Sequence, residues 1–198
     1  MKIKKIAAFM LSGVMMASLL TRCSSVNKDE EGLEACCKLE EIKVIFILYG
    51  SICNIGDIVK KIKEADKIAM VHVDLINGLA SKEIAVNFIK YSTEADGIIT
   101  TKPILVKRAK ELGLHTILRV FLLDSMAYQN IEKECVKVRP DIIEVLPGLM
   151  PKVIRKIAKS IRIPVIAGGL ISEKEDVMAA LDAGAISVST TNPSVWEM

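Results

Sequence analysis

Apolar stretches of strand length alternate with amphipathic stretches of helix length along most of this chain. The strand-like runs lie at 43–48, 67–74, 96–100, 114–121, 141–146, 163–167 and 185–189. Between them, apolar residues recur at helical spacing, as at Ile55, Ile58 and Ile62. Strands that alternate with helices at such regular intervals predict right-handed crossovers and a parallel sheet.

Capping residues indicate where several of these helices begin. Ser81 is expected to cap the helix that runs through Tyr91, and Asp124 the helix after the 114–121 strand. Ser172 is followed three residues later by Glu175, which predicts a capping box at the last long helix.

A shorter segment decides the fold class. Residues 23–27 could supply an eighth strand, ahead of a helix from Asp29 to Cys37. With this strand the chain forms a small TIM-type (β/α)8 barrel, and without it the first strand of the barrel is incomplete. A doubly wound open sheet is the alternative. We favour the barrel because no Gly-x-Gly-x-x-Gly follows an early strand and the glycines cluster at the last strands.

The composition narrows the class of protein. Hydrophobic residues make up 51% of the chain and aromatic residues only 4%, which indicates an aliphatic core of the kind that parallel sheets bury on both faces. The five cysteines include no Cys-x-x-Cys. We therefore expect reduced thiols, no metal site and no cofactor. A net charge of +3 does not by itself indicate a nucleic-acid partner.

The start of the chain differs from the rest, so we divide it into a signal-like or anchor-like segment at 1–25 and a barrel domain at 26–198. Three lysines precede an apolar run at 6–20, which is the layout of an export signal. Arg22 stands directly before Cys23, where a lipoprotein leader has a small residue. An inefficient anchor, a fused start and a simple helix before the barrel all stay open.

The last two strands end in groups that suit a phosphate. In β/α barrels, function lies at the carboxyl ends of the strands, and phosphate commonly binds at the last two. Main-chain amides at Gly168 and Gly169 and the hydroxyls of Ser189, Thr190 and Thr191 could hold an anion there. The alternative is that the glycines make a tight turn and the hydroxyls cap the next helix.

Other strand ends carry charged and polar residues. His72 and Asp74 are two apart on one expected strand, so their side chains share a face. With Lys102, Arg119 and Glu144 they would form a pocket for a small polyol phosphate, or else a satisfied polar layer inside the barrel. No nucleophile elbow or metal-ligand set accompanies them, so the indication of catalysis is weak.

A basic stripe is predicted on one helix. Lys152, Arg155, Lys156 and Lys159 fall at i, i+3, i+4 and i+7, which places them on one face. Such a face attracts a phosphodiester backbone, although most charged helix faces are only solvated.

Several motifs, in this order along the chain, resemble the glycerol-3-phosphate-responsive antiterminators that regulate the bacterial glycerol uptake operon. The similar segments lie at 70–79, 95–102, 121–125, 143–148, 166–170 and 185–191, with Trp196 after them. The resemblance implies a cytoplasmic RNA-binding regulator rather than an enzyme. Its effector would be glycerol 3-phosphate and its target the leader mRNA. It also makes the basic stripe the expected RNA-facing surface.

Three further hypotheses belong with this one. A phosphosugar-type barrel enzyme, such as an isomerase, aldolase or synthase, would share the phosphate site but turn its ligand over. An envelope lipoprotein, tethered to the membrane through residues 1–23, would bind a solute outside the cytoplasm. For a regulator, bound phosphate could order the loops after Gly169 and Thr191, or the interface of a homodimer.

Overall fold

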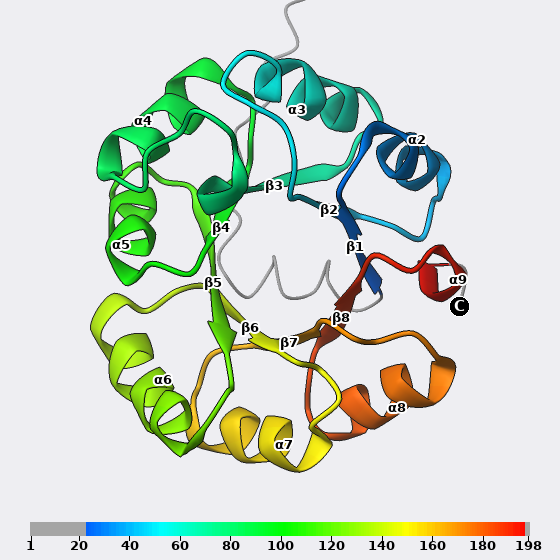
Figure 1. The fold of residues 1–198 in the computed structure, drawn as a ribbon, viewed down its shortest axis with the longest axis vertical. Helices are drawn as coiled ribbons and strands as arrows, with labels where there is room; N and C mark the ends of the chain where they lie inside the picture. Colours follow the sequence, from blue (N-terminus) through cyan, green and yellow to red (C-terminus); the bar gives the residue numbers. More distant parts are fainter. Residues whose placement is uncertain (1–22, 197–198) are drawn as a thin grey trace, which may run out of the picture.

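The computed structural model describes residues 23–196, and the predicted signal-like segment lies almost wholly outside them. Its parallel strands close into a barrel in the order of the sequence (Figure 1). They are β1 (Cys23–Asn27), β2 (Val44–Ile47), β3 (Ile68–His72), β4 (Gly97–Thr100), β5 (His115–Phe121), β6 (Ile142–Leu146), β7 (Val165–Gly168) and β8 (Ser187–Thr190). The predicted TIM-type (β/α)8 barrel is thus confirmed.

The first strand completes the barrel. β1 pairs with β2 on one side and with β8 on the other, where Ser25 lies opposite Thr190. The open-sheet alternative is therefore wrong, because an open sheet would leave β1 and β8 with unpaired edges.

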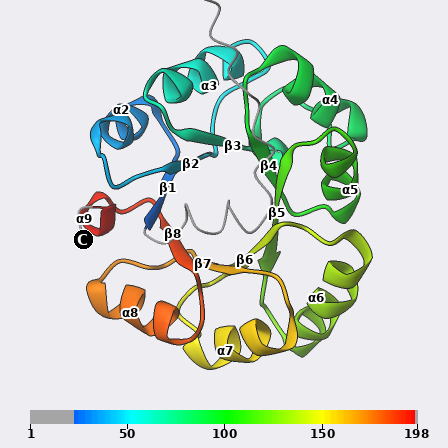
Figure 2. The same ribbon diagram turned by 180° about the vertical axis from the view of Figure 1, so that it is seen from behind.

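Helices surround the barrel on the outside, as Figures 1 and 2 show from its two ends. They are α2 (Glu30–Lys38), α3 (Ile55–Glu64), α4 (Glu83–Ser92), α5 (Pro103–Glu111), α6 (Ser125–Val138), α7 (Pro151–Ser160), α8 (Lys174–Asp182) and the short α9 (Pro193–Trp196), with a 3-10 turn, η1 (Val73–Leu75), after β3. None of the helices within residues 23–196 has the length and apolar character needed to cross a membrane.

Helix capping agrees with the sequence at one predicted position and differs at two. Asp124 caps α6, where its Oδ1 accepts a hydrogen bond from the Ala127 amide at 2.7 Å. The capping box of α8 is made by Glu173 and Asp176, not by Ser172 and Glu175. The amides of Ser172 and Glu173 both donate to Asp176 Oδ2, so the chain enters this helix one residue later than predicted.

The start of α4 also shifts. The N-cap residue of α4 is Lys82, one residue after the predicted Ser81. A tight turn, in which the Lys82 amide donates to the carbonyl oxygen of Ala80 at 2.8 Å, delays the helix to Glu83.

Side-chain alternation places a polar layer above an apolar one inside the barrel. Met70, Ile117 and Ile142 pack with other strand residues in the apolar interior cluster. Two positions further along the same strands stand His72, Arg119 and Glu144, which therefore point to the same face. The charged layer lies toward the carboxyl ends of the strands, where β/α barrels bind their ligands.

Candidate ligand-binding site

A cavity of about 650 Å³ lies at the carboxyl ends of the strands. Arg119 and Glu144 line it from β5 and β6, and the loops after β7 and β8 line its other side. Of the predicted phosphate-binding residues, Gly169, Ser189, Thr190 and Thr191 are in the lining. The fold thus brings together at one site two sets of residues that are far apart in the sequence.

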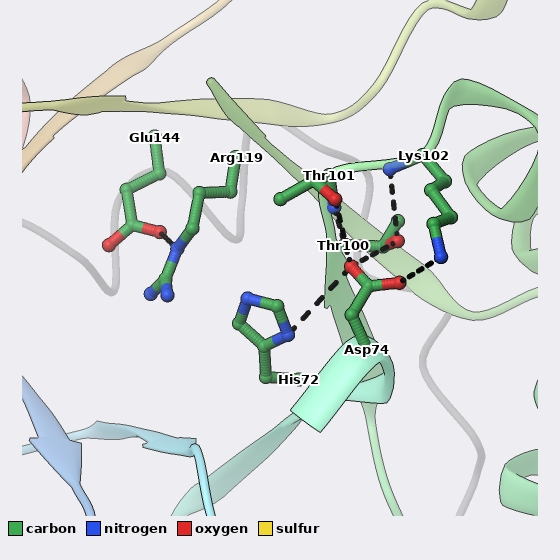
Figure 3. A network of polar contacts seen from close by, with 7 residues as sticks. All are labelled: His72, Asp74, Thr100, Thr101, Lys102, Arg119 and Glu144. Atoms are coloured by element: carbon green, nitrogen blue, oxygen red, sulfur yellow. Dashed lines mark hydrogen bonds and ion pairs between the residues drawn. The ribbon is translucent and has the colours of Figure 1, made fainter. Parts of the chain in front are cut away.

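Glu144 is the centre of the polar contacts at this cavity. Its Oε2 accepts a hydrogen bond from Arg119 Nε at 2.5 Å, and its Oε1 accepts one from Ser189 Oγ at 2.5 Å (Figure 3 shows the pair with Arg119). Arg119 is 7% exposed and Glu144 only 1%. The carboxylate therefore balances the guanidinium charge, which leaves a net neutral pair that suits hydroxyl groups better than a second anion.

Gly168 makes room for these contacts. A Cβ atom at this position would lie 2.4 Å from Ser189 Oγ and 2.7 Å from Glu144 Oε1. The structure thus gives Gly168 a packing role below the site, and it does not place this residue in the cavity lining.

The loop after β7 has an unusual backbone. Gly169 has φ +73° and Leu170 has φ +63°, both in the left-handed region that favours glycine. The carbonyl oxygen of Gly169 accepts a hydrogen bond from the Gly148 amide at 3.1 Å. This bond ties the loop to the segment that leads into α7.

The hydroxyls near β8 have different roles. Thr190 Oγ1 donates to the carbonyl oxygen of Ile171 at 2.8 Å and accepts from the Asn192 amide at 3.1 Å. Thr190 therefore joins the loops after β7 and β8, whereas the exposed Thr191 faces the cavity. Ser189 is committed to Glu144, so Thr191 is the best placed for a ligand among the three predicted hydroxyls.

Sequence reasoning missed Lys28. This exposed lysine directly follows β1 and lines the cavity together with Thr191. Because β1 pairs with β8, the residue after the first strand comes to lie beside the end of the last. A signal was present in the sequence, since a closed barrel with a strand at 23–27 must place the next residue there.

The remaining predicted pocket residues form a separate cluster on the β3–β4 side. Asp74 lies in η1 and not on the strand as predicted, because β3 ends at His72. Its Oδ2 accepts hydrogen bonds from Thr100 Oγ1 at 2.9 Å and from the Thr101 amide at 2.8 Å. Lys102 Nζ is 3.7 Å from Asp74 Oδ1 (Figure 3). Neither Asp74 nor Lys102 is in the cavity lining, so the expected pocket is divided into two clusters.

His72 lies between the two clusters (Figure 3). It is 2% exposed, and its Nδ1 is 3.9 Å from Asp74 Oδ2 without a hydrogen-bond partner among the described residues. Burial, with the nearby Arg119 charge as the second cause, lowers the pKa of His72 to about 4 although Asp74 opposes the shift. The imidazole is therefore neutral near pH 7. Like Asp74 and Lys102, His72 is not in the cavity lining, and its Nδ1 is a buried nitrogen that no described residue contacts by a hydrogen bond.

The basic stripe lies on the outside of α7. Lys152, Arg155, Lys156 and Lys159 are all exposed, while Ile154 and Ile157 on the opposite face are buried. Because α7 follows β6, it begins at the carboxyl end of the barrel, on the same side as the cavity.

Comparison with known proteins gives one family. The model of the family described as glycerol-3-phosphate responsive antiterminator matches residues 24–196. A protein of Escherichia coli (strain K12) described as the uncharacterized protein YgcP is 48% identical over 158 residues, which cover 80% of this chain and 83% of that protein.

Two solved structures are similar over almost the whole barrel. The glycerol uptake operon antiterminator regulatory protein of Listeria monocytogenes is 33% identical with a TM-score of 0.86, covering 89% of this chain and 95% of that one. A glycerol uptake operon antiterminator-related protein of Thermotoga maritima is 33% identical with a TM-score of 0.81, covering 90% and 99%.

Proposed function

The chain belongs to the glycerol-3-phosphate responsive antiterminator family, and we propose from this that it is a cytoplasmic regulator and not an enzyme. In this proposal it binds glycerol 3-phosphate as its effector and, in the bound state, the leader mRNA, so that transcription passes a terminator. The proposal includes no cofactor, since glycerol 3-phosphate is an effector ligand.

The cavity at the carboxyl ends of the strands is the observation that carries the proposal. The phosphate lies between Lys28, Thr191 and the main chain at Gly169, all of which line the cavity. Because Glu144 already balances Arg119, the ammonium group of Lys28 supplies the positive charge for the phosphate. The hydroxyls of the glycerol part then contact the Arg119–Glu144 pair, which offers both a donor and an acceptor.

One hydrogen bond connects the cavity to the segment before α7, so ligand binding can change the position of the basic face of α7. Gly169 lines the cavity, and its carbonyl oxygen holds the Gly148 amide, three residues before the start of α7. A ligand changes RNA affinity only if it binds the RNA-competent state more tightly than the other state. We infer that phosphate fixes the loop after β7 and so the position of α7. If the protein forms a homodimer, the dimer interface is a second part of the structure that bound phosphate could order.

Calorimetric titration tests the ligand site. Glycerol 3-phosphate should bind much more tightly than glycerol, and Lys28→Ala should weaken glycerol 3-phosphate about tenfold while leaving glycerol unchanged. Lys38→Ala, at the end of α2, is the matched control because Lys38 is not in the cavity lining. Equal affinities for the two ligands would contradict the proposed phosphate site.

Two further measurements test the regulator. Affinity for a leader transcript of a glycerol uptake operon should rise on addition of glycerol 3-phosphate, and an unchanged affinity would refute the coupling. Incubation with triose and pentose phosphates should give no product. Turnover of any of them would instead favour the phosphosugar-type enzyme.

A further inference from the structure

A groove that begins between α6 and α7 and continues along the outer face of α6 is a second surface feature of the barrel. Two adjoining cavities of about 510 Å³ and 660 Å³ form it, and both are lined by Tyr128 and Gln129 of α6. Val153 and Lys156 of α7 help to line the first, whereas the second, which includes Lys133, is lined by residues of α6 alone. We call this feature the α6–α7 groove.

Tyr128 occupies the middle of the α6–α7 groove. Its side chain is half-buried and packs against the hydrophobic cluster under α6 and α7, while part of it faces both cavities. The packing holds the ring in place, so that stacking on it would cost little additional ordering. Aromatic side chains fixed in this way are the platforms on which proteins stack the bases of single-stranded nucleic acid.

The charges around Tyr128 suit a phosphodiester backbone. Lys156 stands on the α7 side and Lys133 further along α6, and the exposed Lys152 and Arg155 extend the basic face of α7. Asp124 also lines the groove, but its carboxylate is engaged in capping α6. Glu132 is the remaining acidic residue in the lining.

From these observations and resting on the proposed function, we propose that the α6–α7 groove binds unpaired bases of single-stranded RNA. Tyr128 stacks on one base, and Lys133 and Lys156 contact the phosphates on either side of it. Double-stranded RNA does not fit this arrangement, because its bases are paired and stacked on one another.

The groove and the ligand cavity meet at consecutive residues. Phe121 at the end of β5 lines the ligand cavity, and Leu122 and Leu123 line the α6–α7 groove. The Leu122 amide donates to the carbonyl oxygen of Leu146 at 2.8 Å, and Leu146 also lines the ligand cavity. A ligand that fixes this segment therefore acts on the wall of the groove directly.

Fluorescence anisotropy on the full chain, with saturating glycerol 3-phosphate, tests the groove. The probe is a short labelled single-stranded oligouridylate, compared with an RNA duplex of the same length. Tyr128→Leu keeps apolar packing but removes the ring, and should weaken binding of the single strand about tenfold. Tyr128→Phe should bind as the native chain does. Tyr91→Leu, at a tyrosine that is 74% exposed on α4, is the matched control and should change nothing.

Charge changes give an independent readout. Replacing Lys133 and Lys156 by Gln should lower the slope of log affinity against log salt by roughly 0.7 for each phosphate that the protein no longer neutralises. Glu132→Gln should raise the affinity for the single strand, because it removes a negative charge that repels the RNA phosphates. Native affinity in Tyr128→Leu, or tighter binding of the duplex than of the single strand, would overturn the inference. Failure of the native chain to bind oligouridylate would also overturn it, while the proposed function stands or falls on the leader transcript.

Discussion

Arg119 and Glu144 lie directly opposite each other on β5 and β6, and their side chains form an ion pair inside the barrel, with 2.5 Å between Nε and Oε2. Strand register thus fixes the pairing before any ligand arrives. Two charges this deeply buried are stable only together, because each alone would lose its hydration without compensation. The pair therefore makes the base of the site rigid and electrically neutral.

Removal of one of these two charges should therefore lower the stability of the fold. We expect Glu144→Gln to lower the free energy of unfolding by about 3 kcal/mol, since it leaves the Arg119 guanidinium buried without a counter-charge. Urea unfolding followed by circular dichroism measures this. Glu64→Gln, in an exposed pair with Lys60, is the control and should cost at most about 1 kcal/mol. Similar losses in both variants would mean that the buried pair has no special importance.

The close packing at Gly168 leads to a second prediction. A methyl group there would collide with Ser189 Oγ and Glu144 Oε1, so Gly168→Ala should disrupt the hydrogen bond between them. We expect a loss of about 2 kcal/mol in stability and weaker binding of glycerol 3-phosphate. Gly56→Ala on α3, where the nearest atom to a new Cβ is 3.6 Å away, should be neutral or stabilising. Thermal unfolding measures the stability of both variants, and calorimetry measures their affinity for glycerol 3-phosphate. Native stability and affinity in Gly168→Ala would contradict the prediction.

His72 should make stability depend on pH. Its pKa is about 4 in the folded protein, against an ordinary value of 6.5. Between these values the unfolded chain binds a proton that the folded protein does not, so stability is complete above pH 6.5 and falls as the pH drops toward 4. The total loss is roughly 3 kcal/mol, since each unit of the pKa difference corresponds to about 1.4 kcal/mol. Urea midpoints across this range should fall less steeply in His72→Gln than in the native chain, and equal slopes in the two proteins would contradict the prediction.

The barrel could be predicted from the sequence because its strands are continuous apolar runs between clear turn residues. The last two strand ends, with Gly169 and Thr191, were also correctly placed at the carboxyl end. These features depend on local pattern and on the order of elements, which a single sequence displays directly.

The details of the site depended on contacts that the sequence does not display. Ser189 and Thr190 look equally suited to an anion, yet Glu144 and Ile171 engage their hydroxyls. Asp74 lies on a 3-10 turn because β3 ends two residues earlier, which periodicity alone cannot locate. The position of Lys28 follows from the closure of β1 on β8, which the sequence predicts only as one of two alternatives for the first strand.

Neighbouring threonines after β8 provide the last prediction. Thr190 is buried and joins two loops, so Thr190→Val should lower the free energy of unfolding by about 1–2 kcal/mol, because the carbonyl oxygen of Ile171 and the Asn192 amide each lose a partner. Its affinity for glycerol 3-phosphate should fall as well, since the loops that surround the proposed phosphate site are no longer held together.

Thr191→Val separates the two effects. Thr191 is exposed at the cavity, so this change should leave stability within about 0.5 kcal/mol of the native value. Its affinity for glycerol 3-phosphate should nevertheless fall about tenfold, because the donor that we propose for the phosphate is lost. Chemical unfolding gives the free energy of unfolding of each variant, and calorimetry gives the affinity of each for glycerol 3-phosphate. If Thr191→Val bound the ligand normally, the phosphate would have to lie away from the end of β8, and Lys28 would lose its assigned role with it.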